Sequence, residues 1–400
     1  MEKPELLVPV GNFEMLQVAV DSGADAIYFG VAGLNMRASA KNFKITDIKA
    51  VLDLCHENDV KAYLCINTII FEDEIVLVKK ILSSAKKIGV DAIICWDQSV
   101  ISIARKMDFE IHLSTQASVS NSVSAKEYKK LGISRIVLAR ECTLKNIKEI
   151  RKNVDVEVET FVHGAMCVAI SGRCFMSENL YGKSANRGEC IQPCRRSYDV
   201  TDPETSKELE MFNNYVMSPK DLCTIQIFDK LIDAKIDCFK IEGRNRSPEY
   251  LKVTIECYKK AIELYFKKKL TKKKKNELFE KLKTVYNRGF STGFFLGKPI
   301  DAWTDAYGSK STMVKEYVGK VLNYYGEVNV AEVKLETGNL QLNEDIMIIG
   351  PTTGCQNLVV ESLQIERKNV KNVFKGQSVG LKVVEKVRKN DKIYRWMKRK

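Results

Sequence analysis

Short apolar runs alternate with amphipathic stretches along residues 5–243 of the chain. Eight of these runs have the length and apolar content of buried strands. They are Glu5–Val10, Ala26–Gly30, Lys61–Asn67, Asp91–Asp97, Glu110–Thr115, Arg135–Glu141, Val156–His163 and Cys238–Gly243. Apolar residues recur every three or four positions in the helical segments Ile45–Asn58, Glu74–Ile88, Ser124–Leu131 and Thr143–Lys152. This alternation predicts an α/β protein with a closed, parallel, TIM-like (β/α) barrel.

The alternative for such an alternating pattern is an open, doubly wound sheet. In dinucleotide-binding sheets of that type a G-x-G-x-x-G motif follows the first strand, and the residues after Val10 do not contain it. The barrel is therefore the favoured architecture.

The pattern changes after the last predicted strand of the barrel. Ser247-Pro248-Glu249 has the cap, the proline and the acid of a helix start, and predicts a helix through Tyr265. A second helix is expected from Asn276 to Tyr286, and both should pack on the barrel. Asn287–Lys298 is rich in glycine and aromatic residues, which indicates a linker or a loop that touches the site.

Short strands broken by glycine, asparagine and proline begin near Tyr317 and predict a small C-terminal all-β barrel. The expected domains are a barrel over residues 1–300 with a cysteine-rich insert at 164–223, a linker over 301–316 and the small barrel over 317–400. Asn343–Gly354 is similar to the β-barrel domain that follows the G domain in translation GTPases. Trp396 and the basic end Lys398–Lys400 would suit an RNA partner.

Composition and charge narrow the class of protein. A hydrophobic content of 45% allows a large core, and no apolar run approaches the roughly 18 residues of a membrane span. The first ten residues do not resemble a signal peptide, so the 12 cysteines are expected in a reducing cytoplasm, without a membrane partner. Six cysteines in apolar segments should be buried small hydrophobes: Cys55, Cys65, Cys95, Cys142, Cys238 and Cys257.

The net charge of +13 favours a polyanionic partner such as RNA, although a lysine-rich solvated surface is the alternative. The densest basic run, Lys267–Lys275, joins two predicted helices. It is either an exposed helical hairpin or a patch that follows phosphates.

Four cysteines lie close together in the segment Glu159–Arg196. They are Cys167, Cys174, Cys190 and Cys194, separated by six, fifteen and three residues. Thiolates bind zinc or iron–sulfur clusters, and structural zinc usually takes its ligands in closely spaced pairs. The irregular spacing favours an iron–sulfur cluster; zinc, disulfides and unliganded thiols are the alternatives.

Polar residues stand where the predicted strands end, which is where TIM barrels carry their active sites. They are Asn12, Asn67, Asp97, Ser114, Gln116, Arg140, Glu141, His163, Glu242 and Arg244. Since the cysteine segment begins directly after His163, it should lie over the barrel mouth. The alternative for each of these residues is that it stands at a strand end only because polar residues favour turns.

His163 is the best acid/base candidate among the three histidines, because His56 falls in a helix and His112 within a strand. It could equally donate a hydrogen bond to a cluster sulfur, which we favour slightly. Glu242 is a candidate base, or would orient Arg244 as an ion-pair partner.

Arginine binds carboxylate and phosphate groups in bidentate fashion. The substrate-binding candidates are therefore Arg37, Arg140, Arg173 and Arg244, together with Asn67 and Gln116 at strand ends.

One segment resembles a known family. The sequence ETFVHGAMCVAISGRCFMS, Glu159–Ser177, is similar to the signature of the collagenase-like peptidase family U thirty-two. Gly188–Arg196, Ser218–Cys223 and Phe239–Tyr250 also resemble segments of that family, so the likeness covers nearly the whole chain.

The better understood members of this family modify RNA. They include the prephenate-dependent hydroxylase of the tRNA wobble uridine, a relative that acts on ribosomal RNA, and hydroxylation factors of ubiquinone synthesis that carry four-iron clusters. The resemblance implies a tRNA hydroxylase that makes 5-hydroxyuridine and uses prephenate as co-substrate. It also implies a partner chain of the same family. It also implies a 4Fe-4S cluster on Cys167, Cys174, Cys190 and Cys194, with Cys223 in reserve.

The family name suggests a protease as the alternative, and another cluster-dependent hydroxylation, of ribosomal RNA or a small molecule, is a third. The chain has no H-E-x-x-H motif of a zinc protease. A protease would have to use a nucleophile such as Cys167 with His163 as its base.

Overall fold

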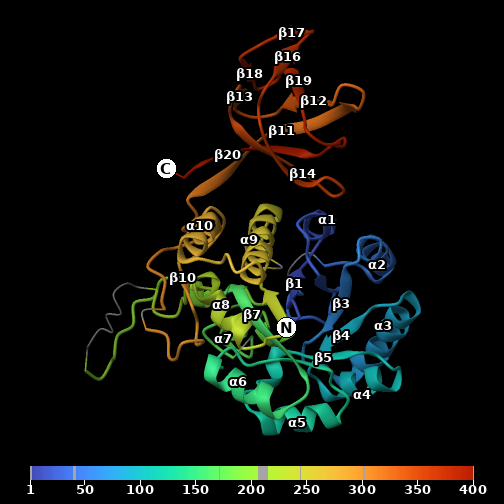
Figure 1. Cartoon of the computed structure of the whole chain (residues 1–400), viewed down its shortest axis with the longest axis vertical. Helices are drawn as coiled ribbons and strands as arrows, with labels where there is room; N and C mark the ends of the chain where they lie inside the picture. Colours follow the sequence, from blue (N-terminus) through green and yellow to red (C-terminus); the bar gives the residue numbers. More distant parts are fainter. Residues whose placement is uncertain are drawn as a thin grey trace.

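Eight parallel strands close into a barrel in the computed structural model, which describes residues 2–38, 42–170, 172–205, 215–243, 245–300 and 302–399 (Figure 1). Neighbours along the chain pair from β1 to β7, and β9 pairs with both β7 and β1 to complete the circle. The eight strands are β1 (Glu5–Pro9), β2 (Ala26–Gly30), β3 (Lys61–Ile66), β4 (Ala92–Cys95), β5 (Ile111–Leu113), β6 (Arg135–Val137), β7 (Glu157–Gly164) and β9 (Cys238–Ile241). The predicted TIM-like barrel is confirmed.

Helices surround the strands. They are α1 (Phe13–Asp21), α2 (Ile48–His56), α3 (Ile75–Ile88), α4 (Gln98–Lys106), α5 (Ser122–Lys130), α6 (Leu144–Asn153), α8 (Phe228–Asp233), α9 (Pro248–Phe266) and α10 (Lys272–Lys283). Asn12 caps α1 by accepting the backbone N–H of Met15 at 2.9 Å, and Gly89 ends α3 in the left-handed conformation. None of the helices in the described residues combines the length and apolar content needed to cross a bilayer.

Alternate strand residues face opposite sides of the barrel wall. Outward side chains pack against the helices in one large core, while a smaller group that includes Leu7, Tyr28, Tyr63 and Ile94 fills the interior. All six cysteines expected to be buried hydrophobes are buried, as predicted.

The basic run Lys267–Lys275 joins α9 to α10 and is largely exposed. Lys267 pairs with Glu263 and Lys274 with Glu277, so acids of the same hairpin balance part of its charge. This part of the chain is the exposed helical hairpin that was one of the two expectations.

Charged side chains lie inside the barrel. Arg135 Nη1 is 2.6 Å from Glu5 Oε1, and Arg135 Nε donates to Glu157 Oε2 at 2.7 Å. Further along the axis, Lys240 Nζ lies 2.7 Å from Glu159 Oε1, and the Glu159 carboxylate is fully buried. Each buried cation therefore has a carboxylate close by, as burial of a charge requires.

The C-terminal strands form a separate antiparallel sheet of eight strands in the order β15-β14-β20-β11-β12-β19-β16-β17. Their bounds are β11 (Met313–Tyr325), β12 (Val330–Leu335), β14 (Asp345–Gly350), β15 (Gly354–Val359), β16 (Leu363–Ile365), β17 (Lys368–Asn369), β19 (Ser378–Lys382) and β20 (Lys392–Lys398). Two further strands, β13 (Asn339–Gln341) and β18 (Asn372–Phe374), pair with each other. The region is all-β as predicted; its described strands form a sheet whose ends, β15 and β17, do not pair with each other.

The C-terminal sheet packs on the outside of the barrel, next to α1 and α9 (Figure 1). Met347, Ile349 and Cys355 of this sheet belong to the same apolar core as the barrel helices. Lys315 Nζ also lies 2.7 Å from Glu249 Oε2 at the start of α9.

The cysteine lobe, residues 165–170 and 172–200, leaves the barrel at the end of β7. It contains α7 (Met176–Tyr181). After it, β8 (Asp221–Cys223) runs antiparallel to β7, and β10 (Phe290–Ser291) pairs with β8, a pair of strands that the sequence pattern did not predict. The lobe packs tightly on the loop after β2, because a Cβ on Gly188 would stand only 2.2 Å from the carbonyl oxygen of Asn35.

Replacing Arg135 with methionine should cost roughly 3–5 kcal/mol of stability, because Glu5 would stay buried without its cation. Burial pushes the pKa of Glu5 upward, but the hydrogen bond and charge of Arg135 outweigh it and hold that pKa below its ordinary value. In the wild type this pairing stabilises the fold at pH values above the ordinary pKa of glutamate. The stabilisation is lost as the pH falls through the lowered pKa of Glu5 in the folded protein. In the variant the contributions of Arg135 are gone while burial and the Tyr63 hydrogen bond remain, so Glu5 takes up a proton more readily than in the wild type and the deficit shrinks as the pH falls.

Urea unfolding at pH 7 and pH 5 measures this deficit. Lys129→Met is the control, because its pair with Asp155 is exposed and 3.3 Å long and should be worth less than about 1 kcal/mol. An Arg135→Met protein as stable as the wild type at pH 7 would contradict the prediction.

Gly188→Ala should loosen the cysteine lobe more than Gly182→Ala does. Both glycines have positive φ, +84° and +61°, so both substitutions carry the roughly 1–2 kcal/mol cost of a left-handed residue. Only at Gly188 does the new Cβ meet backbone atoms, whereas nothing lies within 4 Å of it at Gly182. Thermal unfolding and limited trypsin digestion of the lobe test this, and equal effects of the two changes would contradict it.

Candidate functional site

A cavity of about 130 Å³ lies between the carboxyl ends of the barrel strands and the cysteine lobe. That is room for about four water molecules. Its walls come from residues at the ends of β2 to β7 and β9 and from the cysteine lobe. It is the position in which TIM barrels carry their active sites.

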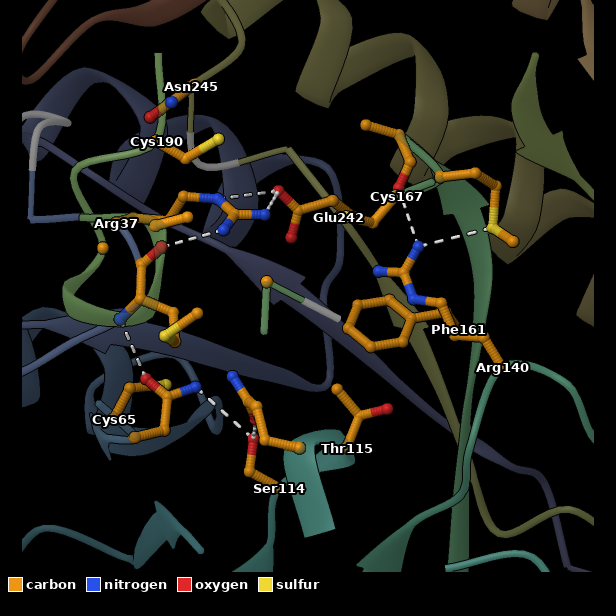
Figure 2. Close-up of a pocket in the computed structure, with 18 of the residues that line it drawn as sticks. Arg37, Cys65, Ser114, Thr115, Arg140, Phe161, Cys167, Cys190, Glu242 and Asn245 are labelled. Atoms are coloured by element: carbon orange, nitrogen blue, oxygen red, sulfur yellow. Dashed lines mark hydrogen bonds and ion pairs between the residues drawn. The ribbon is translucent and has the colours of Figure 1, made fainter. Parts of the chain in front are cut away.

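Arg37 and Glu242 form an ion pair in the wall of this cavity. The guanidinium donates to Glu242 Oε1 from Nη2 at 2.9 Å and from Nε at 3.3 Å, and Figure 2 shows the two side chains facing each other. The Tyr28 hydroxyl lies 3.3 Å from the other carboxylate oxygen. The Glu242 carboxylate raises the pKa of Arg37 above its ordinary value, so this arginine stays charged. The expected partner of Glu242, Arg244, lies outside the described residues.

Asn67 and Gln116 form a polar strip across the cavity floor. Asn67 Oδ1 accepts the backbone N–H of Met36 at 3.1 Å, and its amide nitrogen lies 3.4 Å from Ser114 Oγ. The Ser114 hydroxyl donates to the side chain of Gln116. Both predicted residues line the cavity, and this chain of hydrogen bonds orients them.

Arg140 lines the cavity without a carboxylate partner among the described residues. Its Nη1 donates to the carbonyl of Ala165 at 2.7 Å, and the guanidinium lies 4.0 Å from the centre of the Phe161 ring (Figure 2). Burial lowers its pKa, and its Nε has no hydrogen-bond partner within the described chain.

Arg173 lies outside the cavity wall. It stacks on Trp96, at 5.3 Å from the ring centre, and donates to the carbonyl of Gln116 at 3.3 Å. These contacts anchor the lobe to the barrel rim.

Lys240 is a cavity residue that the strand-end search missed. It lies on β9, two residues before Glu242, and its Nζ is 4.4 Å from the centre of the Tyr28 ring. The signal was available, because a lysine at alternate spacing from a strand-end glutamate must point to the same side. Asn245, Gln192 and Arg195 also line the cavity and come from loops, for which no periodic signal exists.

The four predicted cysteine ligands share one neighbourhood. Cys167, Cys190 and Cys194 line the cavity, and Cys174 lies in the lobe just behind it. Burial raises the pKa of Cys190 and of Cys194, and the charges of Cys167 and Cys174 raise both further. Cys223 is buried on β8 beside Tyr258 and does not line the cavity.

The chemistry of this donor set fits an iron–sulfur cluster. Backbone N–H groups point at two of the sulfurs, from Met176 to Cys174 Sγ and from Gln192 to Cys190 Sγ, each at 3.4 Å. Such N–H···S bonds stabilise thiolates that hold iron. Among the described residues no three Cys, His, Asp or Glu side chains are already gathered as a finished metal site.

His163 lies behind the cavity wall and does not line it. It is 1% exposed, and its Nδ1 is 3.4 Å from the Tyr258 hydroxyl. Burial, aided by the charge of Arg246, lowers its pKa to about 3, so the ring is neutral. This environment suits a structural residue, and the acid/base role of His163 has no support from its position. The other expected role, a hydrogen bond to a cluster sulfur, stays a prediction.

The chain resembles characterised proteins over most of its length. The profile of Peptidase family U32 matches residues 11–305. The chain is 41% identical over 407 residues to a collagenase of Porphyromonas gingivalis, covering 99% of this chain and 98% of that protein. It is 34% identical over 359 residues to tRNA hydroxylation protein P1 of Bacillus subtilis, covering 88% and 84%. A 23S rRNA 5-hydroxycytidine synthase of Escherichia coli is 34% identical over 259 residues, covering 65% of this chain and 39% of that protein.

The matched segment contains the barrel strands from β2 onward and the cysteine lobe, so the cavity and the thiols described above are features that the profile spans. The chain belongs to peptidase family U32.

Proposed function

We propose that this protein hydroxylates RNA, and that its substrate is the wobble uridine of tRNA, which becomes 5-hydroxyuridine. The observation that carries the proposal is a lobe with four neighbouring thiols, three of which line a cavity that guanidinium groups also line. Relatives named for tRNA hydroxylation and for rRNA hydroxycytidine synthesis support RNA as the substrate class. The net charge of +13 supports a polyanionic partner.

Cys167, Cys174, Cys190 and Cys194 would hold a 4Fe-4S cluster in this proposal. When bound, the cluster supplies one-electron transfer beside the cavity. The protein's own contribution is to fix the thiol loops, through N–H···S bonds and through the packing of Gly188 on the barrel rim. Full ligation by four cysteines leaves substrate binding to the side chains of the cavity.

Prephenate is the proposed co-substrate, because it carries two carboxylates and the cavity carries cations. Arg37 is paired with Glu242 and Lys240 with Glu159, whereas Arg195 adjoins the thiols, so Arg140 is the cation that we assign to the co-substrate. Its guanidinium stacks on Phe161 and keeps Nε unpartnered in the described chain. Glu242, held by Arg37 and Tyr28 at the rim, is the proposed acid/base.

The RNA must present an unpaired base to such a cavity, since the reacting carbon of a stacked uridine is out of reach. A partner chain of the same family would cover apolar side chains that the cysteine lobe exposes, of which Phe175 is 66% exposed and Leu180 53%.

Proteolysis is the second candidate, because of the relative named collagenase. A Cys167 nucleophile would need a base within reach. His56, His112 and His163 are all within the described residues, and none of them lines the cavity that Cys167 faces. The geometry therefore favours the RNA proposal.

Anaerobically purified protein should contain about four irons and matching acid-labile sulfide per chain. Cys190→Ser should lose most of the iron and the broad visible absorption, because it removes one of the four thiols. Cys223→Ser and the distant Cys355→Ser should retain both. Zinc in place of iron, or full iron in Cys190→Ser, would contradict the proposed ligand set.

Cells that lack this protein should lose 5-hydroxyuridine from their tRNA, measured by mass spectrometry of nucleosides. The wild-type gene should restore it, and Glu242→Gln should lower the rate of formation by about 10²-fold or more, since it removes the proposed acid/base. Glu336→Gln, an exposed site on the C-terminal sheet, is the control and should restore it fully. Unchanged tRNA in the deletion strain, with peptide cleavage by the purified protein, would overturn RNA hydroxylation in favour of proteolysis.

A further inference from the structure

Three arginines, Arg195, Arg246 and Arg288, lie near one carboxylate, Asp221, beneath the cysteine lobe. Arg288 Nη1 lies 3.4 Å from Asp221 Oδ1, and Arg246 Nη2 lies 3.9 Å from Asp221 Oδ2. Arg195 forms no ion pair with any described residue, and the charge of Arg288 adds to burial in lowering its pKa. Asp221 is 2% exposed and Arg288 5%, so solvent screens this group of charges poorly.

Hydrogen bonds from neutral groups hold Arg195 in place. Its Nη1 donates to the carbonyl of Pro219 at 2.8 Å, and its Nη2 donates to the carbonyl of Met166. Its Nε is buried without a partner in the described chain. Within the described chain Arg195 is thus fixed by neutral groups, and Asp221, which pairs with Arg246 and Arg288, compensates its charge only in part.

The partly compensated charge of Arg195 faces the thiols. Arg195 is the neighbour of Cys194 in the chain and lines the cavity together with Cys167 and Cys190. Arg288 Nη2 donates to Gln192 Oε1 at 3.1 Å, and the backbone N–H of Gln192 points at Cys190 Sγ. The arginine group and the thiol loops are thus one connected unit.

A buried positive charge without a counter-ion is costly, and a neighbouring anion removes that cost. Four thiolates that hold a cluster are such an anion. We propose that Arg195, with Arg246 and Arg288 behind it, is the counter-charge of the four-thiol group and raises the reduction potential of its iron–sulfur cluster. The inference rests on the iron–sulfur cluster of the proposed function. Arg195 itself does not react in it; its charge acts on the cluster.

The physical reason is electrostatic. Reduction places one electron, and so one negative charge, on the thiolate-bound group without breaking a bond. A fixed guanidinium at short range in a poorly screened environment stabilises the reduced form more than the oxidised form. Removing that charge must shift the potential to more negative values, and removing the Asp221 carboxylate must shift it the other way.

The test is a dithionite titration of the full-length, anaerobically purified protein with redox mediators, followed by visible absorbance. We expect Arg195→Gln to have a more negative potential than the wild type and Arg195→Lys, which keeps the charge, to stay close to it. Arg196→Gln is the matched control, because Arg196 is the next residue, is exposed and bonds to the Tyr181 hydroxyl instead. Asp221→Asn should have a less negative potential than the wild type.

Iron and sulfide content, measured first, separates the two possible failures. Wild-type protein without iron overturns the cluster of the proposed function. Protein with a full cluster whose potential is the same in Arg195→Gln and the wild type overturns the present inference. If Arg195→Gln does not retain iron, Arg288→Gln and Asp221→Asn must shift the potential in opposite directions, and a shift of the same sign in both overturns it.

Discussion

Closure of the parallel barrel is the constraint on which the rest of the structure depends. All eight strands run the same way, so every strand ends at one rim, and residues far apart in the chain meet there. Arg37 and Glu242 are 205 positions apart and form an ion pair because β2 and β9 both flank β1 in the barrel. The cysteine lobe leaves from the end of β7 at this same rim, which places its thiols over the cavity without any long connection.

Charge inside the barrel follows a simple rule. Deep in the interior each cation has its own carboxylate, as in Arg135 with Glu5 and Lys240 with Glu159. At the rim the balance changes, because Arg140 and Arg195 are held by carbonyl groups and form no ion pair with a carboxylate in the described part of the chain. Carbonyls can orient a guanidinium but cannot neutralise it, so the rim keeps a positive potential that the interior lacks. An anionic co-substrate and thiolate-bound iron are the groups that such a potential favours.

Regular elements were predictable from the sequence because each strand and helix has its own local periodicity. The eight barrel strands, α9 and the all-β C-terminal region were found in this way. Loop geometry has no such signal. Arg37 was identified as an anion-binding candidate, but its pairing with Glu242 follows from the path of the loop after β2, and Arg195 depends on a turn that begins with Gln192 in the left-handed conformation. For His163 the strand-end rule gives the position along β7 but not the side that its side chain faces, and its ring lies against Tyr258 behind the cavity wall.

The placement of the histidines restricts the chemistry further. His56 bonds to Asp91, His112 to Glu110 and His163 to Tyr258, and none of the three reaches the cavity. Proton transfer at the mouth must therefore use Glu242, Lys240 or a thiol. Glu242 and Lys240 are each held by an oppositely charged partner, Arg37 and Glu159, which fixes both side chains in the cavity wall. The cavity wall combines fixed charges with three thiols, and a hydrolase that depends on a histidine base would find none among the described residues that line it.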